Sequence, residues 1–481
     1  MKLNQLTIKQ AGEMLAKKEI TSVELIKACL KRIKEVDGKI KACLTVCEKE
    51  ALAEAKSADA RRAKGETGEL LGIPYLAKDN IMTRGTRTTA ASKILENYIA
   101  PYDATIIKKL RQAGAVLLGK TNLDEFAHGA STENSAFGPT HNPWDLTRVP
   151  GGTSGGSGAG VAADMCIFAL GTDTGGSIRC PASFCGITGL KPTYGRGSRF
   201  GLIAATSSTD VPGPLTKTVE DAAIVLSVIA GKDEHDATTV KSPLPPLVKR
   251  GKIQGLTIGL PKEYFIKGTD KGVTEAIEKA KEDLKKLGVK FKEVSLPHTK
   301  YVVPTYYIIN PSEISSNLAR FDGIKYGLSA EGKNLMEIYT KSRGKGFGPE
   351  AKRRIMLGTY ALSAGYYDAY YLQAQKVRTK IKQEMDKVLE AVDCLLTLVQ
   401  PTVAWKIGEK GQDPLKMYLE DIFVTGASLA GLPAISIPCG FDKKMPVGLQ
   451  LIGKRFDEAM LFKVGQAYEQ ATEWHLKKPK I

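Results

Sequence analysis

Two segments set this chain apart from ordinary composition: Pro150-Gly-Gly-Thr-Ser-Gly-Gly-Ser-Gly-Ala-Gly160 and Gly171-Thr-Asp-Thr-Gly-Gly-Ser177. Both are rich in glycine and hydroxyl side chains, and the segment between them is apolar. Glycine permits positive φ and close approach of the backbone, so such loops can present backbone N–H groups to an anion or an oxyanion. A flexible linker is the alternative, but the apolar segment and the neighbouring Pro, Trp and Cys positions favour packed, functional loops.

Outward from these loops, short apolar runs alternate with helical patterns. Strands are predicted at 71–77, 115–118, 256–260, 290–296 and 394–399. Helices are predicted at 105–112 and 273–287. Alternation of strand and helix is typical of an α/β fold.

Helical texture dominates two further regions. Residues 1–65 are predicted as helices, one of them opened by a capping box at Thr21 and Glu24. Residues 305–392 are predicted as a helical excursion. Since no linker or fixed-period repeat interrupts the chain, we expect residues 1–481 to form a single domain.

Composition limits the class of protein. A chain of 481 residues with 42% hydrophobic and 25% charged residues is globular, which excludes disordered and fibrous classes. The net charge of +17 favours an anionic partner such as nucleic acid, although a solvated basic surface also accounts for it. No CxxC pair, zinc-ligand spacing, signal peptide or membrane-length apolar run occurs, so we expect no metal, no membrane partner and a cytoplasmic location.

Three motif matches conflict with their surroundings. The segment 114–121 fits the phosphate-loop pattern GxxxxGK[ST], but its interior residues resemble a strand. The segment 158–163 fits a dinucleotide fingerprint without a preceding strand. The segment 152–156 fits the GxSxG nucleophile elbow, but it follows a loop, and the later histidines lie in polar surroundings.

Lys78 offers another way to activate a hydroxyl. It ends the apolar run Leu70-Leu-Gly-Ile-Pro-Tyr-Leu-Ala-Lys78, where burial would lower the pKa of its amine. A neutral lysine can act as a general base, as in Ser-Lys variants of the catalytic triad. On these residues alone, a surface lysine is the simpler interpretation.

Lys78, the segment 150–157 and the segment 171–192 together resemble the amidase signature family. The resemblance implies a mixed central β-sheet flanked by helices. It also implies that Ser177 is the nucleophile, Lys78 the base and residue 153, after a cis peptide bond, the hydroxyl that relays the proton. Backbone N–H groups at Thr174, Gly175, Gly176 and Ser177 would form the oxyanion hole.

Further segments resemble one branch of this family, the glutaminase (A) subunits of tRNA-dependent amidotransferases. They are 123–126, 131–138, 315–326, 348–358 and 446–453. In this branch Arg354 would hold the α-carboxylate of glutamine and Asp421 its α-ammonium, a pairing that suits both groups.

The branch implies a complex of three subunits. The glutaminase subunit would hydrolyse glutamine through an acyl-enzyme and supply ammonia to partner subunits B and C. The complex uses ATP and Mg²⁺ to amidate misacylated Glu-tRNA(Gln) or Asp-tRNA(Asn). No cofactor is expected on this chain, and we expect most tRNA recognition to lie on the partner.

Two departures from the family pattern affect these expectations. Thr153 stands where the family has Ser; it keeps a hydroxyl but adds a β-branch, and Ser154 beside it is the alternative relay or a substrate contact. The segment Ser207-Ser-Thr-Asp-Val211 replaces the usual Ser-Ser-Leu-Asp-Gln. Two other functions therefore stay open: a stand-alone amidase for small amides, and a basic tRNA-binding scaffold without catalysis.

Overall fold

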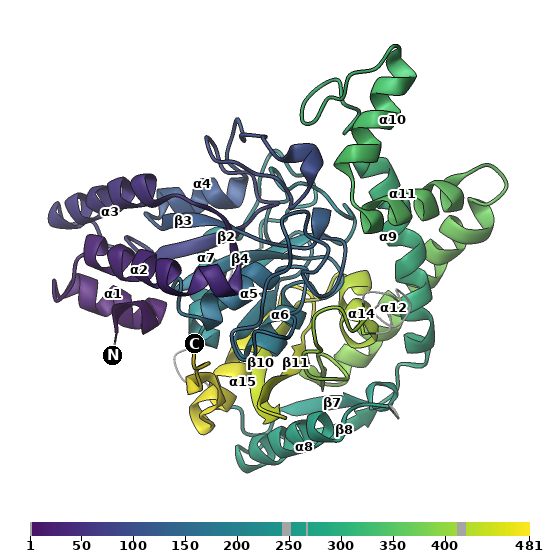
Figure 1. Cartoon of the computed structure of the whole chain (residues 1–481). Coiled ribbons are helices and arrows are strands. Elements are labelled where there is room, and N and C mark those ends of the chain that lie inside the picture. The colour runs from purple at the N-terminus through teal and green to yellow at the C-terminus, as the bar shows by residue number, and fades with distance from the viewer. Residues whose placement is uncertain (1, 243–251, 266–267, 411–419) are drawn as a thin grey trace.

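The computed structural model describes residues 2–242, 252–265, 268–410 and 420–481, and the strands within them form one mixed sheet (Figure 1). In sheet order the strands are β1 (Cys43–Val46), β3 (Val116–Thr121), β2 (Pro74–Lys78), β4 (Phe168–Asp173), β6 (Val211–Thr216), β5 (Thr188–Lys191), β10 (Ala434–Asp442), β11 (Met445–Ile452), β9 (Cys394–Leu398), β7 (Thr257–Pro261) and β8 (Lys290–Val294). The pairs β2–β3, β2–β4, β7–β8 and β7–β9 are parallel, and the others are antiparallel. The predicted α/β fold with a mixed central sheet is confirmed.

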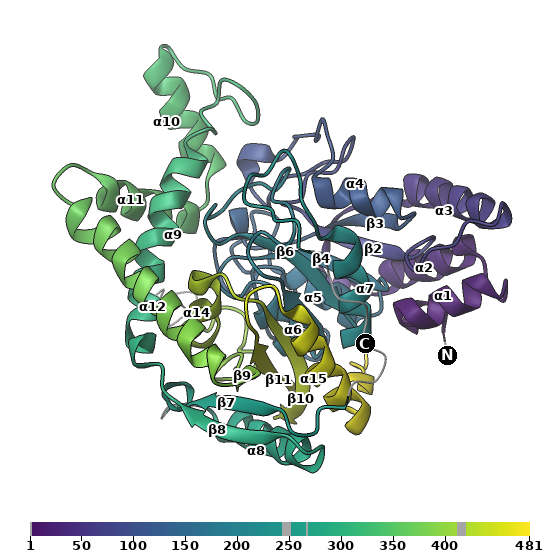
Figure 2. The ribbon, with the colours of Figure 1, turned by 180° about the vertical axis from the view of Figure 1, so that it is seen from behind.

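The strands that carry the Gly-rich loops lie deep in this sheet. Every residue of β2, β3 and β4 is buried, because helices cover both faces of parallel strands. The helices around the sheet include α4 (Thr105–Gln112), α7 (Val219–Ile229), α8 (Lys271–Lys286), α14 (Ile422–Ala430) and α15 (Glu458–Ala471). Figure 2 shows β10 and β11 between α6 (Arg179–Cys185) and α15.

The N-terminal region is helical with one exception. It contains α1 (Ile8–Ala16), α2 (Ser22–Ile40) and α3 (Glu48–Ala63), and the Thr21 side chain caps α2 as its capping box predicts. The prediction of helix throughout 1–65 is wrong at β1, which pairs with the edge of β3. A four-residue strand is too short to show a clear periodicity in the sequence. Its pairing partner, β3, also lies far along the chain, so no local pattern reveals the pairing.

The first Gly-rich segment is only partly a loop. From Gly155 to Ala162 it forms helix α5, which is buried along its whole length. Glycine weakens a helix but allows close packing: a Cβ at Gly156 would lie 2.5 Å from the carbonyl oxygen of Asn122. Tertiary packing thus overrides the loop that composition predicts.

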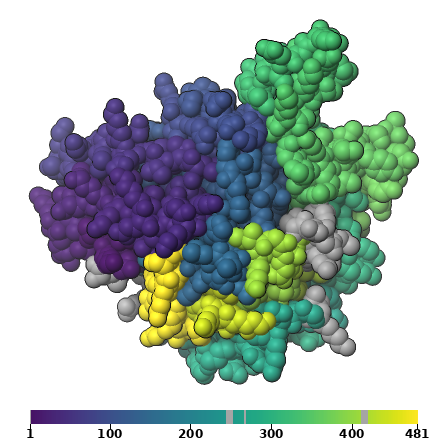
Figure 3. Space-filling view, viewed as in Figure 1, coloured from purple at the N-terminus to yellow at the C-terminus, as the bar shows by residue number. Residues whose placement is uncertain are grey.

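The helical excursion projects from the body of the molecule (Figures 1 and 3). It consists of α9 (Val302–Leu318), α10 (Leu335–Gly346), α11 (Pro349–Leu362), a π-helical turn (Asp368–Leu372) and α12 (Gln373–Glu390). These bounds agree with the prediction for 305–392, apart from the non-helical residues between α9 and α10 and those between α11 and the π-helical turn. Among the described residues, no helix has the length and apolar character needed to cross a membrane.

Candidate active site

Lys78 occupies the last position of β2, where its amine is completely buried. Its Nζ lies 2.6 Å from Oγ1 of Thr153, 3.0 Å from Oγ1 of Thr172 and 3.3 Å from the carbonyl oxygen of Thr172. The simpler interpretation of Lys78 as a surface residue is therefore wrong. The run of apolar residues before it forms a central strand that carries the lysine inward.

Burial sets the protonation of this amine. It lowers the pKa of Lys78 to about 7, because a charged ammonium is poorly solvated there. The carboxylates of Asp124, Asp173 and Asp210 oppose this shift. A substantial fraction of Lys78 is consequently neutral at neutral pH.

Thr153 and Ser154 differ in where their hydroxyls point. Thr153 follows a cis peptide bond from Gly152, as the family resemblance implies, and its hydroxyl faces the Lys78 amine. The hydroxyl of Ser154 instead donates to the carbonyl of Thr172, at 3.2 Å. The geometry therefore favours Thr153 over Ser154 as the neighbour of the lysine.

Ser177 stands just before α6, with its side chain at the edge of a small pocket. Its carbonyl accepts a hydrogen bond from the Ser154 N–H at 3.1 Å, which ties the two Gly-rich segments together. Within the described parts of the chain, the Ser177 hydroxyl has no hydrogen-bond partner. The link from Lys78 to Thr153 is thus formed in this structure, and the link from Thr153 to Ser177 is not.

The amides expected to form an oxyanion hole are not equally available. The Gly176 N–H donates to the Asp173 carboxylate at 2.8 Å. A Cβ at Gly176 would meet Val424 and Cys180, and its φ of +136° also requires glycine. The N–H groups of Thr174, Gly175 and Ser177 have no acceptor among the described residues.

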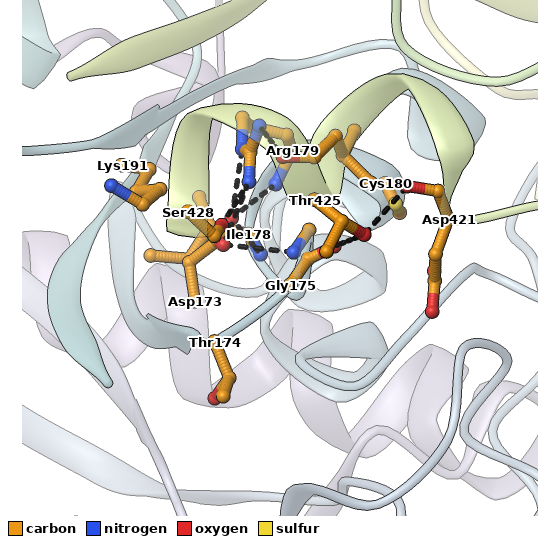
Figure 4. A network of polar contacts seen from close by, with 12 residues as sticks. Asp173, Thr174, Gly175, Ile178, Arg179, Cys180, Lys191, Asp421, Thr425 and Ser428 are labelled. Carbon is orange, nitrogen blue, oxygen red and sulfur yellow. Dashed lines mark hydrogen bonds and ion pairs between the residues drawn. The ribbon is translucent and has the colours of Figure 1, made fainter. Parts of the chain in front are cut away.

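A buried ion pair holds this turn in place (Figure 4). Arg179 pairs with Asp173 at 2.9 Å, and its guanidinium also donates to the carbonyl of Val424 and the hydroxyl of Ser428 on α14. Burial alone would raise the pKa of Asp173, but Arg179 beside it lowers that pKa to about 2. Asp173 is therefore a carboxylate at neutral pH and fixes the backbone around Ser177.

The two residues expected to bind substrate line the same pocket as Ser177. Arg354, on α11, donates to Glu350 at 2.7 Å and to Asn310 at 2.6 Å. Asp421 is the residue just before α14, and its carboxylate accepts a hydrogen bond of 2.7 Å from the Tyr307 hydroxyl. Residues far apart in sequence thus place a cation and a carboxylate on the pocket wall with the serine.

The sequence did not single out three other side chains of the site. Thr172 contacts Lys78, Tyr306 lines the pocket, and the Asp124 carboxylate receives the N–H groups of Thr132 and Asn134. For Thr172, its place within the second Gly-rich segment was an available signal. Tyr306 lies on α9, where nothing in the sequence distinguishes a pocket residue from a core residue.

The departures at 207–211 lie next to the site. Thr209 and Val211 are both buried, and Val211 pairs with Asp173 across the sheet. Asp210 accepts a hydrogen bond of 2.7 Å from the Thr174 hydroxyl. The segment therefore supports the turn that precedes Ser177.

The conflicting motif matches are resolved by their surroundings. The phosphate-loop pattern lies on β3, where Lys120 is buried and donates to the carbonyl of Ile81 at 2.6 Å. The dinucleotide pattern falls within α5 and its C-cap. Ser154, the GxSxG serine, follows an irregular segment rather than a strand, as predicted.

The chain matches a known protein family over most of its length. The family model described as Amidase matches residues 24–462. The chain belongs to the amidase family. This membership confirms the resemblance that the Gly-rich segments carry.

Within the family, the chain is similar to proteins named as the A subunit of glutamyl-tRNA(Gln) amidotransferase. The protein of that name from Carboxydothermus hydrogenoformans is 57% identical over 100% of both chains. A crystal structure of the Thermotoga maritima protein of that name is 45% identical with a TM-score of 0.83, covering 100% of this chain and 99% of that one. A peptide amidase in complex with chymostatin is 31% identical with a TM-score of 0.85, covering 99% of each chain.

Proposed function

We propose that this chain is the glutaminase subunit of a tRNA-dependent amidotransferase. The observation that carries the proposal is the pocket in which Ser177, Arg354 and Asp421 meet, beside a buried lysine in contact with Thr153. Similarity over the whole chain to proteins named as the amidotransferase A subunit supports it. The contact between the buried Lys78 amine and the Thr153 hydroxyl, next to the pocket that holds Ser177, argues against a scaffold without catalysis.

The proposed reaction begins with proton transfer through Thr153. The neutral Lys78 amine donates its hydrogens to Thr172 and accepts the hydroxyl proton of Thr153, while Thr153 takes the proton of Ser177. Ser177 Oγ attacks the side-chain amide carbon, and the N–H groups of Thr174, Gly175 and Ser177 stabilise the oxyanion. Gly176, although expected in this role, would contribute only if its N–H left Asp173.

The second half of the reaction returns the protons. The Lys78 ammonium, through Thr153, gives its proton to the departing nitrogen, so ammonia leaves and a γ-glutamyl ester remains on Ser177. Water then attacks the ester by the same relay, which releases glutamate and restores the serine.

Substitutions at Thr153 test this proton relay. We expect Thr153→Ala to lower kcat for glutamine hydrolysis by about 10²-fold or more, because a proton-transfer step is lost. Thr153→Ser should keep near-wild-type kcat, since the hydroxyl remains. Ser154→Ala, a change in the same loop, should cost far less, because that hydroxyl faces Thr172. Ammonia release measured for the three variants gives the order, and wild-type turnover in Thr153→Ala would shift the role to Ser154.

Variants of Arg354 and Asp421 distinguish a glutaminase from a stand-alone amidase. We expect Arg354→Ala and Asp421→Asn each to raise KM for glutamine by about 10-fold or more, because each loses a charge-assisted contact with substrate. Hydrolysis of propionamide, which lacks both α-groups, should be unchanged in Asp421→Asn. If the hydrolysis rates of glutamine and propionamide fall equally in both variants, the chain is better described as an amidase for small amides.

The remaining steps belong to the partner subunits in this proposal. Among the described residues there is no group of three or more His, Cys, Asp or Glu side chains that could hold a metal ion, and the phosphate-loop pattern is a buried strand. In line with the family resemblance, we assign ATP, Mg²⁺ and most tRNA contacts to subunits B and C. Co-purification with the neighbouring subunits, followed by glutamine-dependent amidation of Glu-tRNA(Gln) or Asp-tRNA(Asn), tests this assignment and reveals which tRNA is served.

We also propose that residues 1–481 fold as one domain in the cytoplasm. One sheet includes strands from Cys43 to Ile452, which supports the first part. Thermal unfolding followed by calorimetry should then give one cooperative transition.

A further inference from the structure

His128 is a buried polar side chain that the proposed mechanism does not use. Its imidazole is completely inaccessible to solvent, and neither ring nitrogen has a hydrogen-bond partner in residues 2–242, 252–265, 268–410 and 420–481. Leaving a buried polar group unsatisfied costs about 1–3 kcal/mol, and most such groups in folded proteins are satisfied. An unpartnered imidazole therefore points to a partner that arrives with a ligand.

The position of His128 identifies which ligand. Ala127 and Gly129, on either side of it in the chain, both line the pocket that holds Ser177 and Arg354. The His128 backbone is held on both sides, because its N–H donates to the Glu125 carbonyl and its carbonyl accepts from the Asn134 side chain. The backbone of His128 is thus fixed next to the substrate pocket, and its buried ring is close enough to Arg354, on the pocket wall, to feel the charge of the guanidinium.

The surroundings of His128 determine its protonation state and therefore which hydrogen bonds it can make. Burial lowers the pKa of His128 well below its usual value, and the Arg354 guanidinium nearby lowers it further. A neutral imidazole carries one N–H donor and one acceptor nitrogen. A carboxylate has about four acceptor sites, more than one guanidinium fills, so a neutral donor beside Arg354 complements it without adding charge.

Building on the proposed glutaminase function, we propose that His128 is a second binding residue for the α-carboxylate of the amino-acid substrate, donating a hydrogen bond beside Arg354. The competing explanation is that His128 only fills the core next to Phe126, whose ring centroid lies 6.3 Å away. The two explanations differ in what methionine at this position does. Methionine fills a similar volume without a donor, so a core role would survive the exchange and a carboxylate contact would not.

The test measures binding without turnover. Full-length protein with Ser177→Ala is titrated with L-glutamine and with 4-aminobutanamide, which lacks the α-carboxylate, by calorimetry. Adding His128→Met should raise Kd for glutamine by about tenfold and leave Kd for 4-aminobutanamide unchanged. His128→Asn, which keeps an N–H donor, should restore part of the glutamine affinity and serves as a second variant if His128→Met does not fold. His235→Met, the same change at an exposed histidine, is the control and should leave both constants unchanged.

Each other outcome overturns the inference. If His128→Met binds glutamine as tightly as before, His128 is a structural residue. The same holds if His128→Met loses affinity equally for both ligands and has a lower Tm. In either case the glutaminase proposal stands. Absence of glutamine binding in the Ser177→Ala protein itself overturns the proposed function, and the role of His128 with it.

Discussion

Ser177→Ala is expected to lower glutamine hydrolysis by about 10⁴-fold or more while the protein stays folded. The substitution removes the atom that would form the acyl-enzyme, and losing a nucleophile costs far more than losing one binding contact. Its hydroxyl has no hydrogen-bond partner among the described residues, so the free energy of unfolding should change little. Ammonia release under saturating glutamine and Tm by calorimetry measure both effects.

Ser57→Ala provides the matched control for this prediction. Ser57 is exposed on α3, and the same loss of a hydroxyl there should change neither quantity. In the wild-type protein, rapid quenching during turnover should leave a γ-glutamyl adduct on the peptide that contains Ser177, detected by mass spectrometry. Ammonia release at the wild-type rate from Ser177→Ala would show that another group carries the reaction.

Local sequence patterns predicted part of the fold: strands β2, β3, β7, β8 and β9, helices α4 and α8, and the helical excursion. Helix α4 has the predicted bounds, and β9 begins at Cys394, because amphipathic periodicity and apolar runs are properties of the segments themselves. Strands β4, β5, β6, β10 and β11 were not predicted. Strand β1 and helix α5 were also missed, and these two share a reason. Each depends on a partner distant in sequence: β1 pairs with β3, and Gly156 of α5 packs against Asn122.

The site was harder to predict from the residues alone. Nothing local distinguishes Lys78 from a surface lysine, since its burial follows from the position of β2 in the sheet. Arg354 and Asp421 meet in one pocket because the helical excursion folds back toward α14, and only the family resemblance related them to a substrate. The Asp173–Arg179 pair and His128 depend on three-dimensional neighbours that no spacing reveals.

Loss of the neutral amine at position 78 is the second large effect that we expect. Lys78→Arg should lower kcat/KM for glutamine by about 10³-fold or more, because a guanidinium stays protonated and cannot accept a proton. In the wild type, the pKa of Lys78 is about 7, so kcat/KM should rise as pH increases through 7 and level off above it. Below pH 7 the ammonium form predominates, and titration of Lys78 by itself should lower kcat/KM about tenfold per pH unit.

Other groups near the site titrate in the same range, and a second variant separates them. Burial raises the pKa of Asp421 to about 7, and that of Asp210 to about 6. Protonated Asp421 could not attract the substrate ammonium, so its titration also lowers kcat/KM at acid pH. In Asp421→Asn this contribution is absent, and a midpoint near 7 that remains in this variant but is lost in Lys78→Arg belongs to the Lys78 relay.

Lys191 supplies the control for burial itself. It is also completely buried, and desolvation lowers its pKa to about 7, but its amine donates to the carbonyl of Leu432 and does not contact Thr153. Lys191→Met should therefore leave the midpoint of the pH profile in place. Two results would show that Lys78 is not the proton acceptor. One is a kcat/KM that does not change with pH in Asp421→Asn. The other is pH-dependent hydrolysis that persists in Lys78→Arg, because the proton would then have another acceptor.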